Sequence, residues 1–241
     1  MVRFFALIKG ELLRLARYKL FAASIFVSMM WVGVLHFVDM ENVTGLIPQL
    51  VFMDVTTMAV LLVGVTFIYE RDEATLYSML ISPITKSEYI LAKLVSHTTP
   101  GIVSLSIMYI YALAFKTVDI NYFLLLGGTV LVAFFHSQIG FLLTYYSRDF
   151  TDLVMYIIAY FLVSILPVIL DEFAIITNAV FKKLVFLIPT KAALMIIVGT
   201  TGVIESWKIA LAVTYIIIGS VLLHYLIWRK LHRHFLRGGG E

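Results

Sequence analysis

Long apolar runs alternate with short charged segments along the 241-residue chain. A helix needs about 20 consecutive apolar residues to cross the hydrocarbon core of a bilayer. Runs of this kind predict six membrane-spanning helices, at 20–37, 49–69, 95–115, 122–145, 153–170 and 207–228. The first run is long enough to span and has no small-residue cleavage pattern behind it, so we expect it to remain in the mature protein. The pattern predicts an all-α membrane protein with six transmembrane helices.

The composition supports a lipid environment. Hydrophobic residues make up 61% of the chain and charged residues 14%, whereas soluble domains have roughly 45–50% and about 25%. The mean hydropathy is +1.00. Cysteine is absent, which excludes disulfides and thiolate metal sites. The net charge of +3 reports orientation in a membrane protein, and we expect no nucleic-acid partner.

Basic residues between the runs predict the topology, because short cytoplasmic loops are enriched in Lys and Arg. With both termini cytoplasmic, thirteen of the 18 basic residues lie inside and five outside. The five are Lys116, Lys182, Lys183, Lys191 and Lys208. The chain has no fixed-period repeat and no Pro- or Ser-rich linker, so residues 1–241 are expected to form one transmembrane domain.

The first 19 residues form an amphipathic pattern. One side of a helical wheel carries Phe4, Phe5, Ile8, Leu12 and Leu15, and the basic residues lie outside this arc. Such a helix lies along a membrane surface, with its basic side on anionic lipid headgroups. We therefore predict an interfacial helix over 1–19 that contacts membrane lipids on the inner side. A simple positive-inside anchor is the alternative.

The segment 70–94, between the second and third runs, is longer than a simple connector and carries several local structural signals. Four charged residues at 70–73 lead into a short apolar segment that Pro83 ends. Thr85 and Glu88 then form a capping-box signature for the helix that becomes the third span. We predict a short charged helix that projects toward the cytoplasm and contacts a partner. The alternative is a solvated connector with a charged face.

The residues of this segment carry a family resemblance. The run Glu70-Arg71-x-x-x-Thr75-Leu76, followed by Met79-Leu80, Ser82-Pro83-Ile84-Thr85, Glu88 and Lys93, resembles the cytoplasmic loop of type-2 ABC exporter permeases. In that family the loop lies between the second and third of six spans. The six-span layout of this chain also agrees with the family, so the resemblance covers nearly the whole chain. Within the family, the chain resembles the multidrug and antibiotic export branch. Ala74 stands where the family usually has glycine.

The resemblance implies a coupling helix that docks on a separate ABC ATPase subunit. ATP and Mg would bind to that ATPase, and no cofactor is expected in this chain, which has no G-x-x-x-x-G-K-[ST] phosphate loop. The family also implies a second permease copy, identical or related, and the prokaryotic cytoplasmic membrane. The residues expected to couple to the ATPase are Glu70, Arg71, Glu73, Thr75, Leu76 and Leu80.

The outer stretch 171–206 is too long for a connector and too apolar for a solvated loop. Its short apolar pieces cannot span a bilayer, so we predict re-entrant or interfacial helices broken at Pro189. Type-2 ABC exporter permeases have short outer helices here that cap the pathway. A loosely packed cap without a gating function is the alternative.

Polar residues within the spans give further candidates. Asp54 lies in the second span, where a carboxylate is costly and marks a functional site. It either lines the pathway or reaches interfacial water, and the sequence leaves both open. The four span histidines, His36, His97, His136 and His224, lie at depths that do not suit haem, so we expect packed or interfacial histidines. Pro167 and the pair at 100–101 are expected to kink their spans.

These patterns favour the permease subunit of an ATP-driven exporter of a hydrophobic or amphipathic substrate. No catalytic residue and no metal site is expected in the chain. The rival is a membrane-embedded redox protein or enzyme acting on a lipid or quinone, which needs several polar residues at one depth. A secondary transporter, the third class, would show inverted repeats and more midplane charges.

Overall fold

The computed structural model describes residues 2–73 and 84–237. Within these ranges the regular structure is helical, and one isolated bridge joins the loops at Asn42 and Thr117. The described residues contain six helical segments that are long and apolar enough to cross a membrane. Their bounds are Leu20–Phe37, Leu46–Asp72, Lys86–Phe115, Tyr122–Tyr146, Phe150–Glu172 and Ser206–Lys230. The predicted all-α membrane fold is confirmed.

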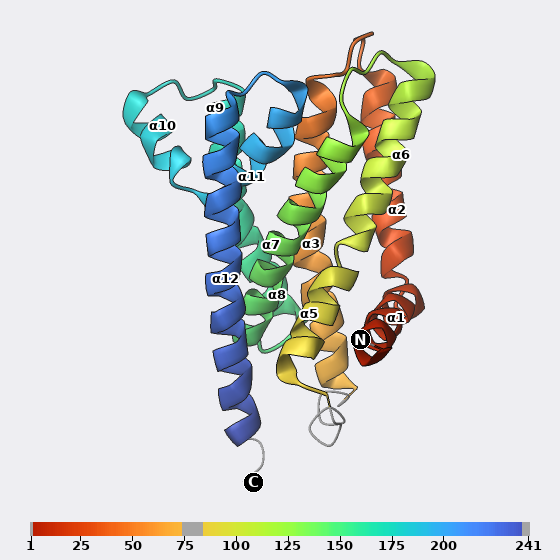
Figure 1. Cartoon of the computed structure of the whole chain (residues 1–241), viewed down its shortest axis with the longest axis vertical. Coiled ribbons are helices and arrows are strands. Elements are labelled where there is room, and N and C mark those ends of the chain that lie inside the picture. Colours follow the sequence, from red (N-terminus) through yellow and green to blue (C-terminus); the bar gives the residue numbers. More distant parts are fainter. Residues whose placement is uncertain (1, 74–83, 238–241) are drawn as a thin grey trace.

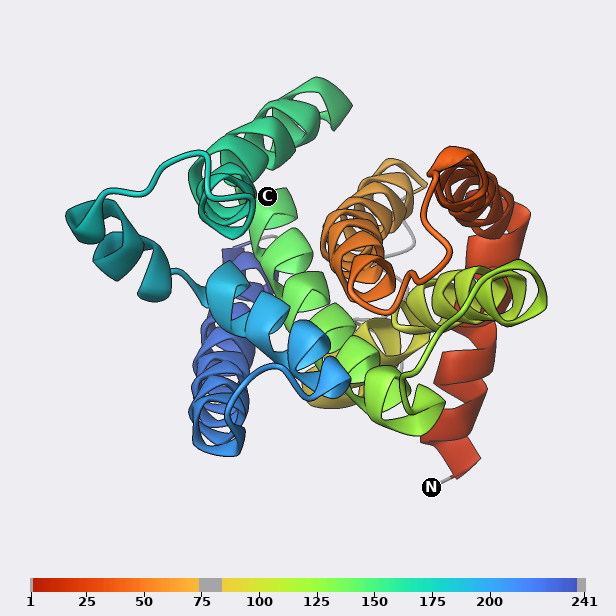
Figure 2. The ribbon, with the colours of Figure 1, turned by 90° about the horizontal axis from the view of Figure 1, so that it is seen from above.

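The spans stand side by side, and the first helix lies at the edge of the bundle below α2 (Figure 1). α1 (Val2–Arg17) is oriented crosswise to the spans and is seen lengthwise in Figure 2, where α2 (Leu20–Phe37) and α3 (Leu46–Asp72) are seen nearly along their axes. α1 and the last turns of α12 (Ser206–Arg237) lie at the same end of the bundle. We call this the terminal end.

Two spans extend beyond the bounds that hydropathy predicts. α3 continues to Asp72, so Glu70 lies within the helix and not in the following loop. The third span begins at Lys86 with α5 (Lys86–Ser96), breaks at His97 and Thr98, and continues as α6 (Thr99–Phe115). The break lies just before Pro100, near the predicted kink. Both extensions carry charged residues that hydropathy assigns to a loop.

The predicted capping box starts α5. The Thr85 side chain accepts a hydrogen bond from the Glu88 backbone N–H at 3.2 Å, and Glu88 Oε2 accepts one from the Thr85 N–H at 2.9 Å. Replacing such a cap with alanine costs about 1 kcal/mol. We expect Thr85→Ala to lower the free energy of unfolding by this amount in a denaturant titration, and Thr85→Ser to leave it nearly unchanged. An equal loss in both variants would show that the cap does not stabilise α5.

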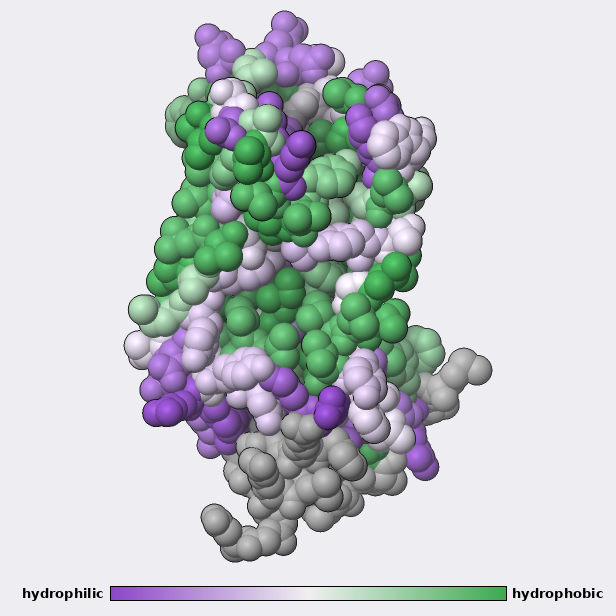
Figure 3. All heavy atoms as spheres, turned by 90° about the vertical axis from the view of Figure 1, so that its left-hand side faces the viewer, coloured by the Kyte–Doolittle hydropathy of each residue, from purple (hydrophilic) through white to green (hydrophobic). Residues whose placement is uncertain are grey.

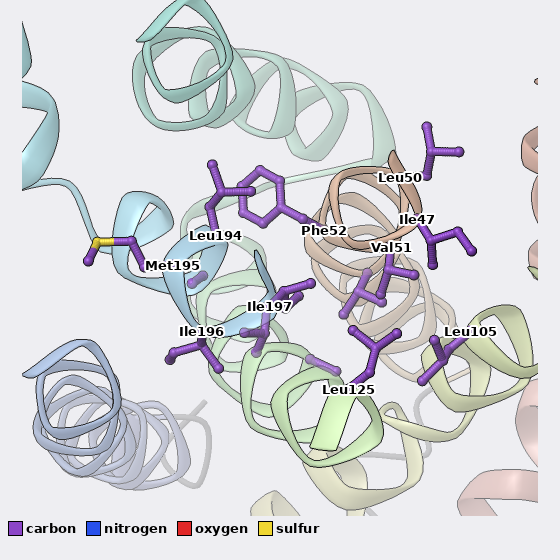
Figure 4. Close-up of a cluster of buried hydrophobic side chains, with 14 of the residues drawn as sticks. Ile47, Leu50, Val51, Phe52, Leu105, Leu125, Leu194, Met195, Ile196 and Ile197 are labelled. Carbon is purple, nitrogen blue, oxygen red and sulfur yellow. The ribbon is translucent and has the colours of Figure 1, made fainter. Parts of the chain in front are cut away.

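The main apolar core surrounds α3. Figure 4 shows side chains of α3 directed toward α6, α7 (Tyr122–Tyr146) and α11 (Pro189–Val198), with Phe52 beside Leu194. Phe52 and Leu194 are both almost completely buried. α3 is the most buried of the spans, so it lies at the centre of the helix packing.

The fifth span and the outer segment that follows it are irregular. The fifth consists of α8 (Phe150–Tyr160), a π-helical turn η1 (Phe161–Ile165) and α9 (Leu166–Glu172). Pro167 follows that turn and cannot donate a backbone hydrogen bond, which agrees with the predicted kink. At the end opposite the termini, α10 (Ala179–Phe186) and α11 meet at 87°, and α11 begins at Pro189, where the sequence predicts the break. A short 3-10 turn, η2 (Gly199–Thr201), follows α11.

The outer spans expose apolar side chains. In Figure 3, hydrophobic residues cover most of the height of the face on the side of α10 and α12, and hydrophilic residues gather toward the two ends. In α12 and in the fifth span, only 17% of the residues in the 18-residue apolar stretch are buried. Such surfaces belong against lipid or a second protein.

Candidate functional site

A cluster of charged side chains lies inside the protein at the terminal end. Glu70, near the end of α3, accepts hydrogen bonds from Lys93 of α5 at 2.6 Å and from Arg14 of α1. Lys93 also donates to Glu11 of α1 at 3.0 Å, and Arg14 donates to Glu11 at 2.8 Å. Two acidic and two basic side chains from three helices thus form one closed network, which we call the ion cluster.

Most of the charged side chains in the ion cluster are buried, although charged residues near a membrane surface are usually in contact with water. The side chain of Lys93 is completely buried, and those of Glu70 and Glu11 are 1% and 7% exposed. Tyr89 of α5 completes the shell by donating its hydroxyl to Glu70 Oε2 at 2.5 Å. Burial alone would lower the pKa of Arg14, but the carboxylates of Glu70 and Glu11 raise it above its ordinary value.

Buried charges tolerate little rearrangement. Separating an ion pair in a low-dielectric site leaves a charge without water or a partner, which is strongly unfavourable. The ion cluster therefore fixes α1 against the ends of α3 and α5. Ser96 of α5 adds a long hydrogen bond to the Ile8 carbonyl of α1 at 3.4 Å. The ion cluster thus joins α1 to the helix before residues 74–83, α3, and to the helix after them, α5.

A second connection at this end runs from α3 to the fifth span. Arg71 donates to the backbone carbonyls of Ser147 at 2.8 Å and Arg148 at 2.5 Å. These two residues join α7 to α8, and the Asp149 side chain caps α8 by accepting from the Asp152 N–H at 2.8 Å. Arg71 thus joins the end of α3 to the start of the fifth span.

The predicted coupling residues fall into three groups. Glu70 is buried in the ion cluster, where its carboxylate pairs with Arg14 and Lys93, and its role in coupling stays a prediction. Arg71 is partly buried, and the exposed Glu73 accepts a hydrogen bond from the Tyr18 hydroxyl at 2.7 Å. Burial and this bond raise the pKa of Tyr18 to about 12. The others lie outside the described residues: Thr75, Leu76 and Leu80.

Asp54 occupies the other candidate position. It is 2% exposed and lies on α3, about 12 Å along the helix axis from Leu46, at the end opposite the termini. Its Oδ1 accepts a hydrogen bond from the Trp31 indole N–H of α2 at 3.1 Å. Asp54 and Trp31 help to line a cavity of about 220 Å³ between α2, α3 and the η1–α9 part of the fifth span. Figure 2 shows α3 set back between α2 and the fifth span.

Comparison with known proteins identifies the family. The sequence pattern of the family described as ABC-2 type transporter matches residues 2–167. This chain belongs to the ABC-2 type transporter family. Two relatives are fluoroquinolones export permease proteins of Mycobacterium tuberculosis, from strains CDC 1551 / Oshkosh and H37Rv. Each is 23% identical over 220 residues, which is 90% of this chain and 90% of the relative.

Family membership confirms the resemblance seen in the coupling segment. The chain is an integral membrane protein and a membrane permease of an ABC transporter. Membership in the ABC-2 family also implies an ABC ATPase as partner.

The sequence did not single out the partners of Glu70 in this ABC-2 permease. The basic residues of the first helix, which include Arg14, were assigned to lipid headgroups. One available signal is that Glu11 is the only acidic residue among the first 19. A second is that Lys93 interrupts the apolar stretch of the third span. Charges at such positions are expensive unless they pair within the protein.

The histidines of the ABC-2 permease make separate local contacts. His36 bonds to the Tyr111 hydroxyl at 2.8 Å, and His97 bonds to Thr66 Oγ1 at the same distance. His136 Nδ1 lies 2.8 Å from the Val132 carbonyl. Within the described ranges, no group of three or more His, Cys, Asp or Glu residues is placed to hold a metal ion.

Proposed function

We propose that this ABC-2 permease is a subunit of an ATP-driven exporter in the prokaryotic cytoplasmic membrane. It moves a hydrophobic or amphipathic molecule outward when a separate ATPase subunit hydrolyses ATP bound with Mg. The mycobacterial relatives are named as permeases for fluoroquinolone export, which supports an amphipathic small molecule as cargo. The terminal end is the cytoplasmic end, as the excess of basic residues in its loops supports.

The ion cluster is the observation that carries the proposal. Residues 74–83 include three of the residues that the resemblance assigns to ATPase coupling, Thr75, Leu76 and Leu80, and are bordered by Glu73 after α3 and Ile84 before α5. Both of these helices are joined to α1 through Glu70 and Lys93. Force applied to residues 74–83 therefore acts on a block of three helices, α1, α3 and α5. In this scheme Glu70 couples by position and not by touching the ATPase.

Arg71 gives the movement a route to the pathway. Its two bonds to Ser147 and Arg148 connect the block to α8, and the continuation of α8 lines the Asp54 cavity through Phe161 and Ile165. A shift at the terminal end is thus transmitted along the fifth span toward the opposite end. The π-helical turn and Pro167 give that span a place to bend.

A second permease copy would cover the face between α2 and the fifth span. Large apolar side chains are exposed along α2, including Phe26 and Met30, and along the fifth span, including Met155 and Leu162. In the proposed dimer, α2 and the fifth span of each copy form the contact, and the two Asp54 cavities face the space between the copies. Asp54 then lines the pathway.

Replacing Arg71 tests the transmission step. We expect Arg71→Ala to retain assembly with the ATPase but to reduce the stimulation of ATP hydrolysis by cargo by about fivefold or more, because a coupling free energy of 1–3 kcal/mol is lost. The matched control is Arg17→Ala, which removes an exposed arginine at the same end. Unchanged stimulation in Arg71→Ala would contradict the proposed route.

Co-purification tests the proposed function itself. The full chain is expressed with an ATPase encoded by a neighbouring gene, isolated through a tag on the permease and assayed for ATP hydrolysis in lipid nanodiscs. We expect a stable complex whose ATPase rate responds to amphipathic compounds. Hydrolysis that never responds to the permease, or failure of any such ATPase to assemble with it, would refute the proposal.

A further inference from the structure

We propose that the Asp54 cavity is a binding subsite for the positively charged group of an amphipathic organic cation. The group is a protonated amine or a quaternary ammonium or phosphonium centre, attached to an apolar body. That this cation is the cargo rests on the proposed export function. The binding itself rests only on the geometry of α2, α3 and the fifth span.

The walls of the cavity fit an apolar body. Apart from Asp54, they are formed mainly by Val27, Trp31, Met53, Met58, Phe161 and Ile165. Ligand pockets for drug-sized molecules measure about 300–1,000 Å³, whereas this cavity measures about 220 Å³. One copy of the chain therefore accommodates part of an amphiphile, and the rest extends into the space outside the cavity.

Asp54 lacks a basic partner. Among the described side chains its hydrogen bond comes from the neutral Trp31 indole to Oδ1, and no described lysine, arginine or histidine forms an ion pair with it. Oδ2 is buried, and the group near it is the neutral hydroxyl of Ser104 on α6. The contrast with the ion cluster is clear, because there every buried carboxylate has a basic partner.

An unpaired carboxylate inside a membrane protein is costly and is stabilised by an opposite charge. A cation in the cavity supplies that charge beside Asp54. The Trp31 ring also lines the cavity, and the face of an indole ring attracts cations. An organic cation fits better than a metal ion, because metal ions require several oxygen or nitrogen ligands and the lining is mostly apolar.

Binding to the full chain in lipid nanodiscs tests the proposal without any ATPase. The probe is radiolabelled tetraphenylphosphonium, which carries a fixed positive charge on an apolar body, and triphenylphosphine oxide is the neutral comparison. Asp54→Asn removes the charge but keeps an oxygen that can accept from Trp31. Asp39→Asn removes an exposed charge at the same end and is the matched control.

We expect Asp54→Asn to weaken tetraphenylphosphonium binding at least about tenfold, since a charge pair in a low-dielectric site is strongly favourable. Asp39→Asn should change it less than about twofold, because exposed charges are screened. Triphenylphosphine oxide should bind all three proteins equally, which also shows that the variants are folded. Asp54→Glu should retain most of the cation affinity.

Three results would overturn the proposal. These are no binding of tetraphenylphosphonium to the wild-type chain, equal binding to wild type and Asp54→Asn, or an equal loss for the charged and neutral probes. The outcome is separable from the export proposal. Cation binding that depends on Asp54, without any ATPase response, would support the subsite and refute export, whereas ATPase coupling with charge-independent binding would refute the subsite alone.

Discussion

Replacing Lys93 with methionine is expected to lower the thermal unfolding temperature by roughly 6–20 °C. Removing one partner of a buried ion pair costs about 3–5 kcal/mol, and each kcal/mol shifts the unfolding temperature by about 2–4 °C in a chain of this size. The effect is large because the ion cluster holds two acidic and two basic side chains, whose charges balance. Without Lys93, two buried carboxylates, Glu11 and Glu70, share the positive charge of Arg14.

A double variant separates charge balance from simple loss of packing. Glu70→Gln combined with Lys93→Met restores one acid and one base, Glu11 and Arg14, which lie 2.8 Å apart. We expect the double variant to recover most of the unfolding temperature lost in Lys93→Met. Thermal unfolding in detergent is measured for the two single variants, Lys93→Met and Glu70→Gln, and for the double variant. If the double variant is as unstable as the sum of the single variants, the cluster is not held by charge pairing.

Gly140→Ala is the second substitution with a large expected effect. A Cβ atom at Gly140 of α7 would lie 2.4 Å from the carbonyl oxygen and 2.8 Å from the Cα atom of Val60 on α3. Backbone atoms cannot move aside as a side chain can, so the two helices must separate. Overpacking of this kind costs about 1–3 kcal/mol, which predicts a decrease of roughly 2–12 °C in the unfolding temperature.

Gly127 provides the matched control on the same helix. A Cβ atom there would meet no atom within 4 Å. Because alanine favours helix more than glycine by about 1 kcal/mol, Gly127→Ala should leave the unfolding temperature unchanged or raise it slightly. An equal decrease in Gly127→Ala and Gly140→Ala would show that the contact between α3 and α7 is not the reason.

The spans could be predicted because the bilayer imposes a length on every helix that crosses it. Hydropathy finds apolar residues only, so it ended the second span at 69, before Glu70. It also began the third span at 95, after Lys93. Both charges lie inside helices because they pair with each other at 2.6 Å. The local signals at Thr85 and Pro189 were sufficient because a cap and a proline act within a few residues.

The ion cluster could not be assembled from the sequence in the same way. Glu11 and Lys93 are far apart in the chain, and nothing local shows that α1 lies against α5. The charge of the segment 70–73 pointed to a partner protein, but Glu70 turned out to be paired within the chain. For Asp54 the physical cost of a buried carboxylate marked the right residue, whereas the cavity beside it depends on how α2 and the fifth span pack.

ATP-driven uptake into proteoliposomes is the decisive measurement. The permease and its ATPase are reconstituted together with the ATPase outside, and accumulation of a fluorescent amphiphile in the lumen is followed. Accumulation should require the permease, the ATPase and hydrolysable ATP with Mg, and Arg71→Ala should abolish most of it while the complex stays intact. Accumulation that is the same without ATP or without the ATPase would show that the chain does not work as an ATP-driven exporter.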